Sequence, residues 1–131
     1  MREFLWSEEM AEACVYNMEN VNFIDLVKKS VVINGNEMIE NCITIAEIRE
    51  ENFEIRNTHI NIGTGQEVSI KNLALLVKEK VGFTGELFFN TEKPDGTMRK
   101  LTDVTKLHNL GWEHLIEIEE GIEKMYDWYT I

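Results

Sequence analysis

Apolar residues recur at helical spacing in three stretches of the chain. One stretch follows Ser69, which can cap a helix that Gly82 would end. Another runs from about Ser7 to Glu19 with Ser7 as its cap, and the last runs to the end of the chain. A spacing of three or four residues predicts amphipathic helices with their apolar residues on one face. The apolar positions are Met10, Ala13 and Cys14, then Ile70, Leu73, Ala74, Val77 and Val81, and finally Ile118, Ile122, Met125, Tyr126 and Tyr129.

Shorter patterns predict two brief helices and several strands. The stretch Phe23–Lys29 ends with two lysines, which favour a helical C-terminus. Asp103 can cap a short helix that continues through Leu110, after which Gly111 ends it. Alternating or apolar runs predict strands at Thr58–Ile62 and Glu86–Asn90, with Arg2–Trp6 as a strand or an extended lead-in.

Residues 30–57 mix helical and alternating patterns, and we expect an insertion there. Only "VVING" is suggestive, because it resembles a strand that enters a turn at Asn34–Gly35. The chain has 131 residues, which fits a single domain spanning residues 1–131. The alternation of short strands with amphipathic helices predicts an α/β fold.

The amino-acid composition and the charge balance of the chain argue against some classes of function. Thirteen basic residues stand against twenty-four acidic ones, for a net charge of -11. This balance argues against nucleic-acid binding, because a non-specific binder needs a continuous basic face. No apolar run is long enough to cross a membrane and no signal peptide begins the chain, so we expect a cytoplasmic protein. Cys14 and Cys42 form no CxxC pair, and the helical pattern predicts that Cys14 is a buried, reduced thiol.

No set of residues in the chain indicates a catalytic or metal centre. "GTG" at Gly63–Gly65 has only two of the three glycines of a dinucleotide fingerprint, so a turn is the better interpretation, although close approach to a ligand stays open. The three histidines lack metal-ligand spacing, and no tyrosine has a lysine one turn later. The glutamate pairs, Glu8–Glu9 among them, are typical of solvated helix faces.

The cations are the remaining candidates. Arg99 and Lys100 follow the Pro94–Gly96 turn, and Arg2 begins the first extended stretch. A guanidinium matches two phosphate oxygens at once, whereas lysine acts as a point charge. From residue types alone, each could equally be a solvated side chain.

Four stretches together resemble one family, the GDP-L-fucose synthases of the extended short-chain dehydrogenase/reductases. They are "MREFLWSEEMAEAC", "HINIGTGQEVSIKNLA", "GFTGELFFNTEKPDGTMRKLTDVTKLHNLGW" and "EEGIEKMYDWY". The resemblance is to the C-terminal, substrate-binding lobe, and "KPDGTxRKLxDVxxLxxLGW" is its specific part. It implies that the Rossmann domain, its NADP site and the catalytic YxxxK set are absent from this chain, so that the chain is inactive alone.

The resemblance also implies roles for individual residues. Arg2 matches the family's arginine that holds the GDP portion, and Lys100 matches a lysine on the substrate side. Asp95 and Arg99 belong to the same loop and are weaker candidates. The implied substrate is GDP-4-keto-6-deoxy-D-mannose, epimerised and then reduced by NADPH in the intact enzyme. Neither a catalytic residue nor a bound metal is expected in this chain.

Departures from the family pattern leave a second interpretation open. "REFLWSEE" replaces the usual "REFLHVDD", and Glu117 stands where the last helix often has a serine cap. A strand that would pair with "REFL" is missing, and an exposed sheet edge invites self-association. The alternative is therefore a non-catalytic oligomerisation or interaction module, which forms homo-oligomers or docks with a separate Rossmann half.

Overall fold

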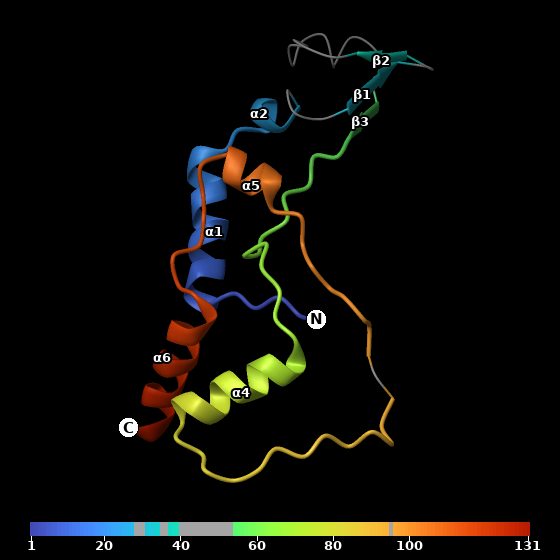
Figure 1. The fold of residues 1–131 in the computed structure, drawn as a ribbon. Helices are drawn as coiled ribbons and strands as arrows, with labels where there is room; N and C mark the ends of the chain where they lie inside the picture. Colours follow the sequence, from blue (N-terminus) through green and yellow to red (C-terminus); the bar gives the residue numbers. More distant parts are fainter. Residues whose placement is uncertain (28–30, 35–36, 40–53, 95) are drawn as a thin grey trace. The chain divides into compact units, whose positions relative to one another are not determined.

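The computed structural model describes residues 1–27, 31–34, 37–39, 54–94 and 96–131. Two compact units are distinguished: the first combines Met1–Ala13 with Asn61–Ile131, and the second is Cys14–Ile60. Five helices and three short strands are described, in the order α1, α2, β1, β2, β3, α4, α5 and α6 (Figure 1). The prediction that residues 1–131 form one domain stays a prediction. None of the described helices has the length and apolar character needed to cross a membrane.

The second unit contains α2 (Phe23–Val27) and a small antiparallel sheet. Its strands are β1 (Val31–Asn34), β2 (Glu37–Ile39) and β3 (Glu54–Arg56), in the order β2-β1-β3. The register pairs Val32 with Ile39 on one side and with Ile55 on the other. The predicted strand in "VVING" is confirmed, while Gly35 and the lysines predicted to end the second helix lie outside the described residues. The proposed insertion at 30–57 falls within this unit and stays a prediction.

Helix α1 (Ser7–Asn20) begins in the first unit, as its apolar spacing predicts, with Glu8 and Glu9 in its first turn. The prediction that Ser7 is the N-cap is wrong by one residue, because the carbonyl of Trp6 already accepts the Met10 N–H at 3.0 Å. Cys14 is free but exposed, so its predicted burial is wrong. The neighbouring Ala13 takes the fully buried position instead.

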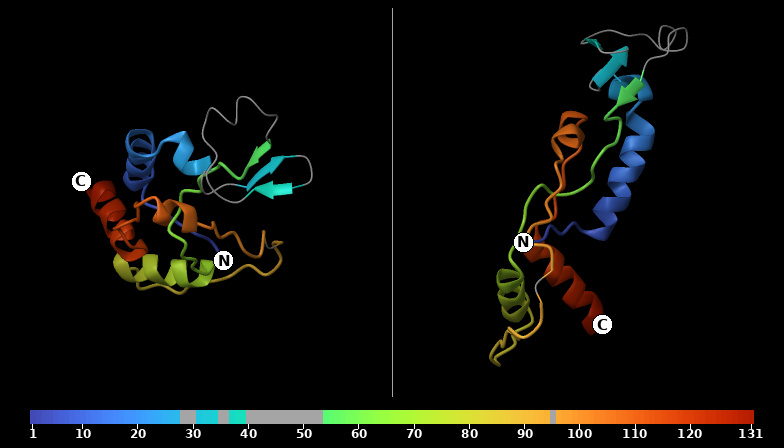
Figure 2. Two further views of the ribbon diagram at one scale, coloured as in Figure 1. Left: turned by 90° about the horizontal axis from the view of Figure 1, so that it is seen from above. Right: turned by 90° about the vertical axis from the view of Figure 1, so that its right-hand side faces the viewer.

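In the first unit, α4 (Ile70–Lys80) and α6 (Ile118–Thr130) pack against each other, and Figure 2 shows them side by side. The predicted serine cap of α4 is confirmed, since the Ser69 hydroxyl accepts the Asn72 N–H at 3.0 Å. Gly82, at φ 69°, ends this helix in the left-handed conformation that glycine tolerates. Lys80 forms an ion pair with Glu123 that links the two helices.

Apart from Ala13, the buried apolar side chains described in the first unit lie at α5 (Thr105–Asn109) and its flanks. Leu107 is fully buried, and Val104 and Trp112 are nearly so. Asp103 lies one residue before the N-cap Val104, yet its carboxylate still accepts the Thr105 N–H at 3.0 Å. The predicted cap therefore binds the start of this helix from one position further upstream.

Two predicted strands are wrong. Thr58–Ile62 and Glu86–Asn90 are both irregular, and Glu86–Asn90 is exposed throughout. A strand needs a neighbour that accepts and donates its backbone hydrogen bonds, whatever the alternation of its side chains. Within the described part of the first unit, the only strand-like pairing is a single antiparallel bridge between Arg2 and Val68. Arg2–Trp6 is accordingly the extended lead-in that the sequence allowed.

Candidate functional site

Arg2 is fixed by its backbone and by its side chain. Its N–H and C=O pair with the backbone of Val68, at 2.9 and 2.8 Å. Its Nη1 donates to the carbonyl oxygens of Thr97, at 2.6 Å, and of Met1, at 2.7 Å. The structure therefore brings Arg2 against the loop that carries the other predicted cations, 95 residues further along the chain.

One edge of the guanidinium is not used by any of the residues that the structure describes. Arginine has five N–H donors, and the two on Nη1 account for the bonds to backbone carbonyls. The Nε–Nη2 edge has no hydrogen-bond partner among the described residues, and this edge can bind two oxygens of a phosphate together. Nη2 lies 3.1 Å from the point where a side chain on Gly96 would begin, so glycine leaves it room.

The two cations after the turn differ in their surroundings. Arg99 donates from Nε to the Glu67 carboxylate at 2.8 Å, which neutralises its charge. Lys100 is exposed and has no ion-pair or hydrogen-bond partner within the described ranges. The ranking of Lys100 above Arg99 as a ligand contact stays a prediction. Asp95, the fourth predicted site residue, lies outside the described residues.

Arg2 and Lys100 line separate hollows. Lys100 and Arg99 lie with Gly65 and residues 101–105 around a shallow hollow of about 730 Å³. Arg2 lines another of about 460 Å³, whose wall includes the acidic residues Glu67, Glu79, Glu117 and Glu119. Such a wall repels an anion, so the Lys100 side is the better seat for phosphate. The two predicted cations are joined through the Arg2–Thr97 hydrogen bond rather than through a shared cavity.

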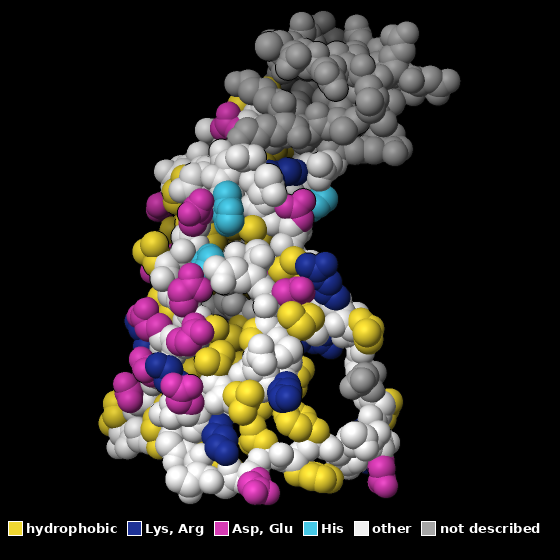
Figure 3. All heavy atoms as spheres, in the orientation of Figure 1, with side chains coloured by type: hydrophobic (Ala, Val, Ile, Leu, Met, Phe, Trp, Pro, Cys, Tyr) yellow, Lys and Arg dark blue, Asp and Glu magenta, His cyan; other side chains and the backbone are white. Residues whose placement is uncertain are grey.

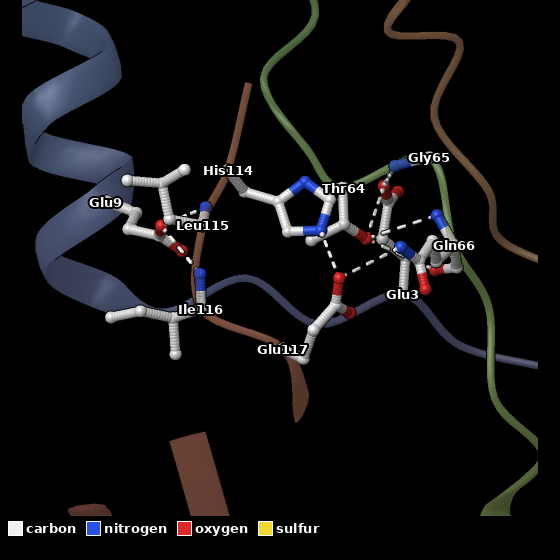
Figure 4. Close-up of polar contacts among 9 residues, drawn as sticks. All are labelled: Glu3, Glu9, Thr64, Gly65, Gln66, His114, Leu115, Ile116 and Glu117. Carbon is white, nitrogen blue, oxygen red and sulfur yellow. Dashed lines mark hydrogen bonds and ion pairs between the residues drawn. The ribbon is translucent and has the colours of Figure 1, made fainter. Parts of the chain in front are cut away.

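Glu3 contacts Thr64, which lines the hollow of Arg2, and Gly65, which lines that of Lys100, and sequence reasoning missed it. Figure 4 shows its carboxylate at the turn formed by Thr64 and Gly65. Oε1 accepts the Gly65 N–H at 2.7 Å and lies 3.4 Å from the Thr64 hydroxyl, while Oε2 accepts the Thr102 N–H at 2.9 Å. Burial alone would raise the pKa of this carboxyl, but the hydrogen bonds from Thr102, Gly65 and Thr64 outweigh burial and hold the pKa below 4.5.

The two glycines of "GTG" are explained by this carboxylate. A side chain on Gly63 would begin 2.5 Å from Glu3 Oε1, inside contact distance. Gly65 has φ 72°, and its N–H is one of the donors that Glu3 uses. The seat for an anion at this turn is therefore filled by a residue of the chain itself. The interpretation of "GTG" as a turn is confirmed. The option of a ligand approaching it stays a prediction, since Gly65 also lines the hollow beside Lys100.

Glu9 is a second carboxylate that sequence reasoning misassigned. It is 4% exposed, and its Oε1 accepts the N–H groups of Leu115 at 2.5 Å and Ile116 at 2.9 Å (Figure 4). The expectation that Glu8–Glu9 is a solvated pair is wrong for Glu9. Glu9 lies four residues before the buried Ala13, so both residues are on one face of the helix. This spacing is the signal in the sequence that could have indicated the burial of Glu9. For Glu3 no such periodic signal exists, because it lies in an irregular stretch.

His114 and Glu117 connect this region to the start of α6. The imidazole side chain is 9% exposed, and its Nε2 lies 3.5 Å from Glu117 Oε1. The same oxygen accepts from Gln66 Nε2 at 3.5 Å. The described residues contain no group of three or more potential metal ligands. These contacts hold the 63–66 turn near the last helix and suggest no chemistry of their own.

An apolar groove of about 540 Å³ lies between α4 and α6 and the first extended stretch. Its wall includes Phe4, Trp6, Val77 and Ile122, and the predicted apolar face of the last helix is confirmed here. Trp128, which also lines it, is 77% exposed. Figure 3 shows hydrophobic side chains reaching the surface in the lower part of the molecule. The groove has no cation in its wall and is unsuited to a phosphate.

Comparison with known proteins places this arrangement in a family. No family model matches the chain. The chain is 37% identical over 129 residues to GDP-L-fucose synthase of Escherichia coli, covering 98% of the chain and 33% of that protein. It is 36% identical over 129 residues to GDP-L-fucose synthase 1 of Arabidopsis thaliana, covering 98% of the chain and 30% of that protein.

A solved structure agrees with these relatives. The crystal structure of a GDP-D-glycero-L-gluco-heptose synthase from Campylobacter jejuni, obtained in the presence of NADPH, matches with a TM-score of 0.73 and 42% identity. The match covers 99% of this chain and 30% of that one. The chain thus spans about a third of the length of the proteins it matches. It belongs to the GDP-L-fucose synthase group of extended short-chain dehydrogenases/reductases and corresponds to the C-terminal part of its longer relatives.

Proposed function

We propose that this chain is the GDP-sugar-binding part of a GDP-L-fucose synthase-like enzyme. In the intact enzyme the substrate is GDP-4-keto-6-deoxy-D-mannose, which is epimerised and then reduced by NADPH to GDP-L-fucose. The observation that carries the proposal is the match of nearly the whole chain to such synthases. The anchoring of Arg2 against the loop that bears Lys100 supports it independently.

In this proposal the chain binds the diphosphate and leaves the chemistry to other parts of the enzyme. Lys100 supplies a point charge from the 96–102 loop, and the Nε–Nη2 edge of Arg2, whose Nη2 lies beside Gly96 of that loop, supplies a fork for two phosphate oxygens. The acidic side chains in the hollow that Arg2 lines weaken its contact relative to that of Lys100. The net charge of -11 makes these placed cations necessary, because the overall field repels an anion. NADP and the acid–base groups would be held outside this chain, and without them the bound sugar cannot react.

Calorimetric titration of GDP into the purified chain tests the proposal. We expect the wild type to bind, and Lys100→Ala and Arg2→Ala each to weaken binding by about tenfold, since a charge-assisted hydrogen bond contributes about 1.5–3 kcal/mol. Arg2→Lys keeps the charge but loses the fork, so it should be weakened as well. Lys71→Ala, which removes an exposed cation on α4, is the matched control and should bind like the wild type. Binding that survives all the Arg2 and Lys100 substitutions would contradict the site.

A second candidate function is a non-catalytic oligomerisation or interaction module. The apolar groove between α4 and α6 favours it, because exposed apolar patches often mark protein interfaces. In this case the chain would associate with a second copy or with a Rossmann-domain protein. Sedimentation velocity distinguishes the two functions: self-association that Trp128→Ser reduces, without any GDP binding, would favour the module. A monomer that binds GDP would favour the substrate-binding part.

A further inference from the structure

The loop from Gly96 to Thr102 is held near both ends by two adjacent residues. Arg2 binds the carbonyl of Thr97 at 2.6 Å, and Glu3 binds the N–H of Thr102 at 2.9 Å. Lys100 lies between these two points. The extended stretch that starts the chain therefore fixes the 96–102 loop on both sides of its unpaired cation.

Glu3 also ties the loop to a second segment. Its other oxygen accepts the Gly65 N–H at 2.7 Å, so one carboxylate bridges the 63–65 turn and the 96–102 loop. Asn61 adds a parallel connection, since its Nδ2 donates to the carbonyl of Asp103 at 3.0 Å. Three segments that are far apart in the sequence meet at the Glu3 side chain. The backbone beside Lys100 is thereby connected to the 63–65 turn.

The charge of Glu3 does not rule out an anion nearby. Its two oxygens accept hydrogen bonds from the N–H groups of Gly65 and Thr102 and from the hydroxyl of Thr64. These hydrogen bonds partly offset its negative charge. The same hydrogen bonds hold the pKa of Glu3 below 4.5, so the group is ionised near neutral pH. An ionised carboxylate that is hydrogen-bonded in this way can fix the backbone geometry without competing with an anionic ligand for Lys100.

We propose that Glu3 is a positioning residue for the phosphate seat, acting through the 96–102 loop on Lys100 and touching no ligand itself. The proposal rests on the proposed function of this chain as a GDP-sugar-binding part. It adds that the affinity for a diphosphate depends on Glu3 only while Lys100 is present. A residue that merely stabilised the fold would affect binding equally with and without that lysine.

Amide NMR tests the loop coupling without any ligand. Glu3→Gln keeps the shape of the side chain but replaces one acceptor oxygen by an NH₂ group, which faces an N–H donor. We expect the amide signals of Gly65, Thr102 and the 97–101 segment to shift together, whereas the exposed Glu8→Gln leaves them in place. Unchanged signals from residues 97–102 in Glu3→Gln would overturn the proposal.

If Glu3→Gln fails to fold, the wild type supplies the same test by acid titration. Protonating Glu3 turns one acceptor oxygen into a hydroxyl and weakens these hydrogen bonds. The amides of Gly65 and Thr102 should therefore follow one titration whose midpoint lies below the ordinary glutamate pKa, and residues 97–101 should move with them. Movement of Gly65 and Thr102 without any change at 97–101 would overturn the coupling.

A double-mutant cycle in GDP affinity tests the action through Lys100. We expect Glu3→Gln to weaken GDP binding by about tenfold in the wild type and by less than about twofold in the Lys100→Ala background. Equal weakening in both backgrounds would overturn the proposal. A wild type that binds no GDP at all would contradict the proposed function, and the amide measurements would then still decide whether Glu3 controls the loop.

Discussion

Replacing Glu9 should destabilise the first unit more than its place in an acidic pair suggests. The side chain is 4% exposed and accepts two backbone N–H groups, from Leu115 and Ile116. These bonds join the first turn of α1 to the segment that leads into α6. Glu9→Ala removes the oxygen that accepts both hydrogen bonds and leaves two donors of the backbone without a partner.

The size of the effect follows from those two bonds. Hydrogen bonds to a charged group contribute about 1.5–3 kcal/mol each. We take the lower end, because the bonds are only partly buried and Oε2 of Glu9 is buried without a partner, which offsets part of the gain. Glu9→Ala should therefore lower the free energy of unfolding by about 2 kcal/mol. Glu9→Gln can keep both hydrogen bonds at its amide oxygen but loses the charge that strengthens them, so it should lower the free energy by about 1 kcal/mol.

Urea unfolding followed by tryptophan fluorescence measures this directly, because Trp112 lies in the buried cluster of the same unit. Glu8→Gln is the matched control: Glu8 is the exposed neighbour and contacts only the indole N–H of Trp6 among the described residues, at 3.2 Å. Its free energy of unfolding should differ from that of the wild type by less than about 0.5 kcal/mol. If Glu9→Ala and Glu8→Gln unfold alike, the reasoning about the buried carboxylate is refuted.

Three further outcomes follow from the structure. Gly63→Ala should lower the free energy of unfolding by about 1–3 kcal/mol, because its methyl would start 2.5 Å from Glu3 Oε1. In a Glu3→Ala background the same change should cost less than half as much, and equal costs would refute the close contact. The stability advantage of the wild type over Glu3→Gln should be complete above about pH 4.5 and disappear as pH falls through the lower pKa of the folded state; an advantage that persists at pH 2 in urea titrations would contradict the assignment. Leu107→Ala should lower the free energy of unfolding, measured by thermal unfolding, by about 2–5 kcal/mol, because the side chain is fully buried. Leu115→Ala, at a side chain that is 85% exposed, should be nearly neutral. A small effect at Leu107 would place the core elsewhere.

The helices could be predicted from the sequence because their signals are local. A hydroxyl at Ser69, apolar residues three and four apart, and a glycine at position 82 define α4 without knowledge of the rest of the chain. The predicted strands at 58–62 and 86–90 failed for the opposite reason. A strand depends on a partner that is distant in sequence, and alternation alone does not reveal whether one exists.

The candidate site shows the same difference between local signals and contacts with residues far away in the sequence. Residue chemistry singled out Arg2, Arg99 and Lys100, and the structure distinguishes them by the Glu67 carboxylate that pairs with Arg99. The role of Glu3 could not be predicted from the sequence, because it depends on contacts with Gly65 and Thr102, which are 62 and 99 residues away. Its carboxylate also explains the "GTG" stretch, which resembles a ligand-binding motif yet binds a side chain of the same protein.

Mapping GDP onto the chain by amide NMR tests the central claim most directly. The account predicts that GDP shifts the signals of Arg2 and of residues 96–102, with saturation at one affinity, and that guanosine, which lacks the diphosphate, leaves them unchanged. Lys100→Ala should abolish the shifts around position 100 at the same GDP concentration, while Lys71→Ala preserves them. Shifts confined to the groove between α4 and α6, or equal shifts with guanosine, would contradict the assignment of this loop as the diphosphate seat.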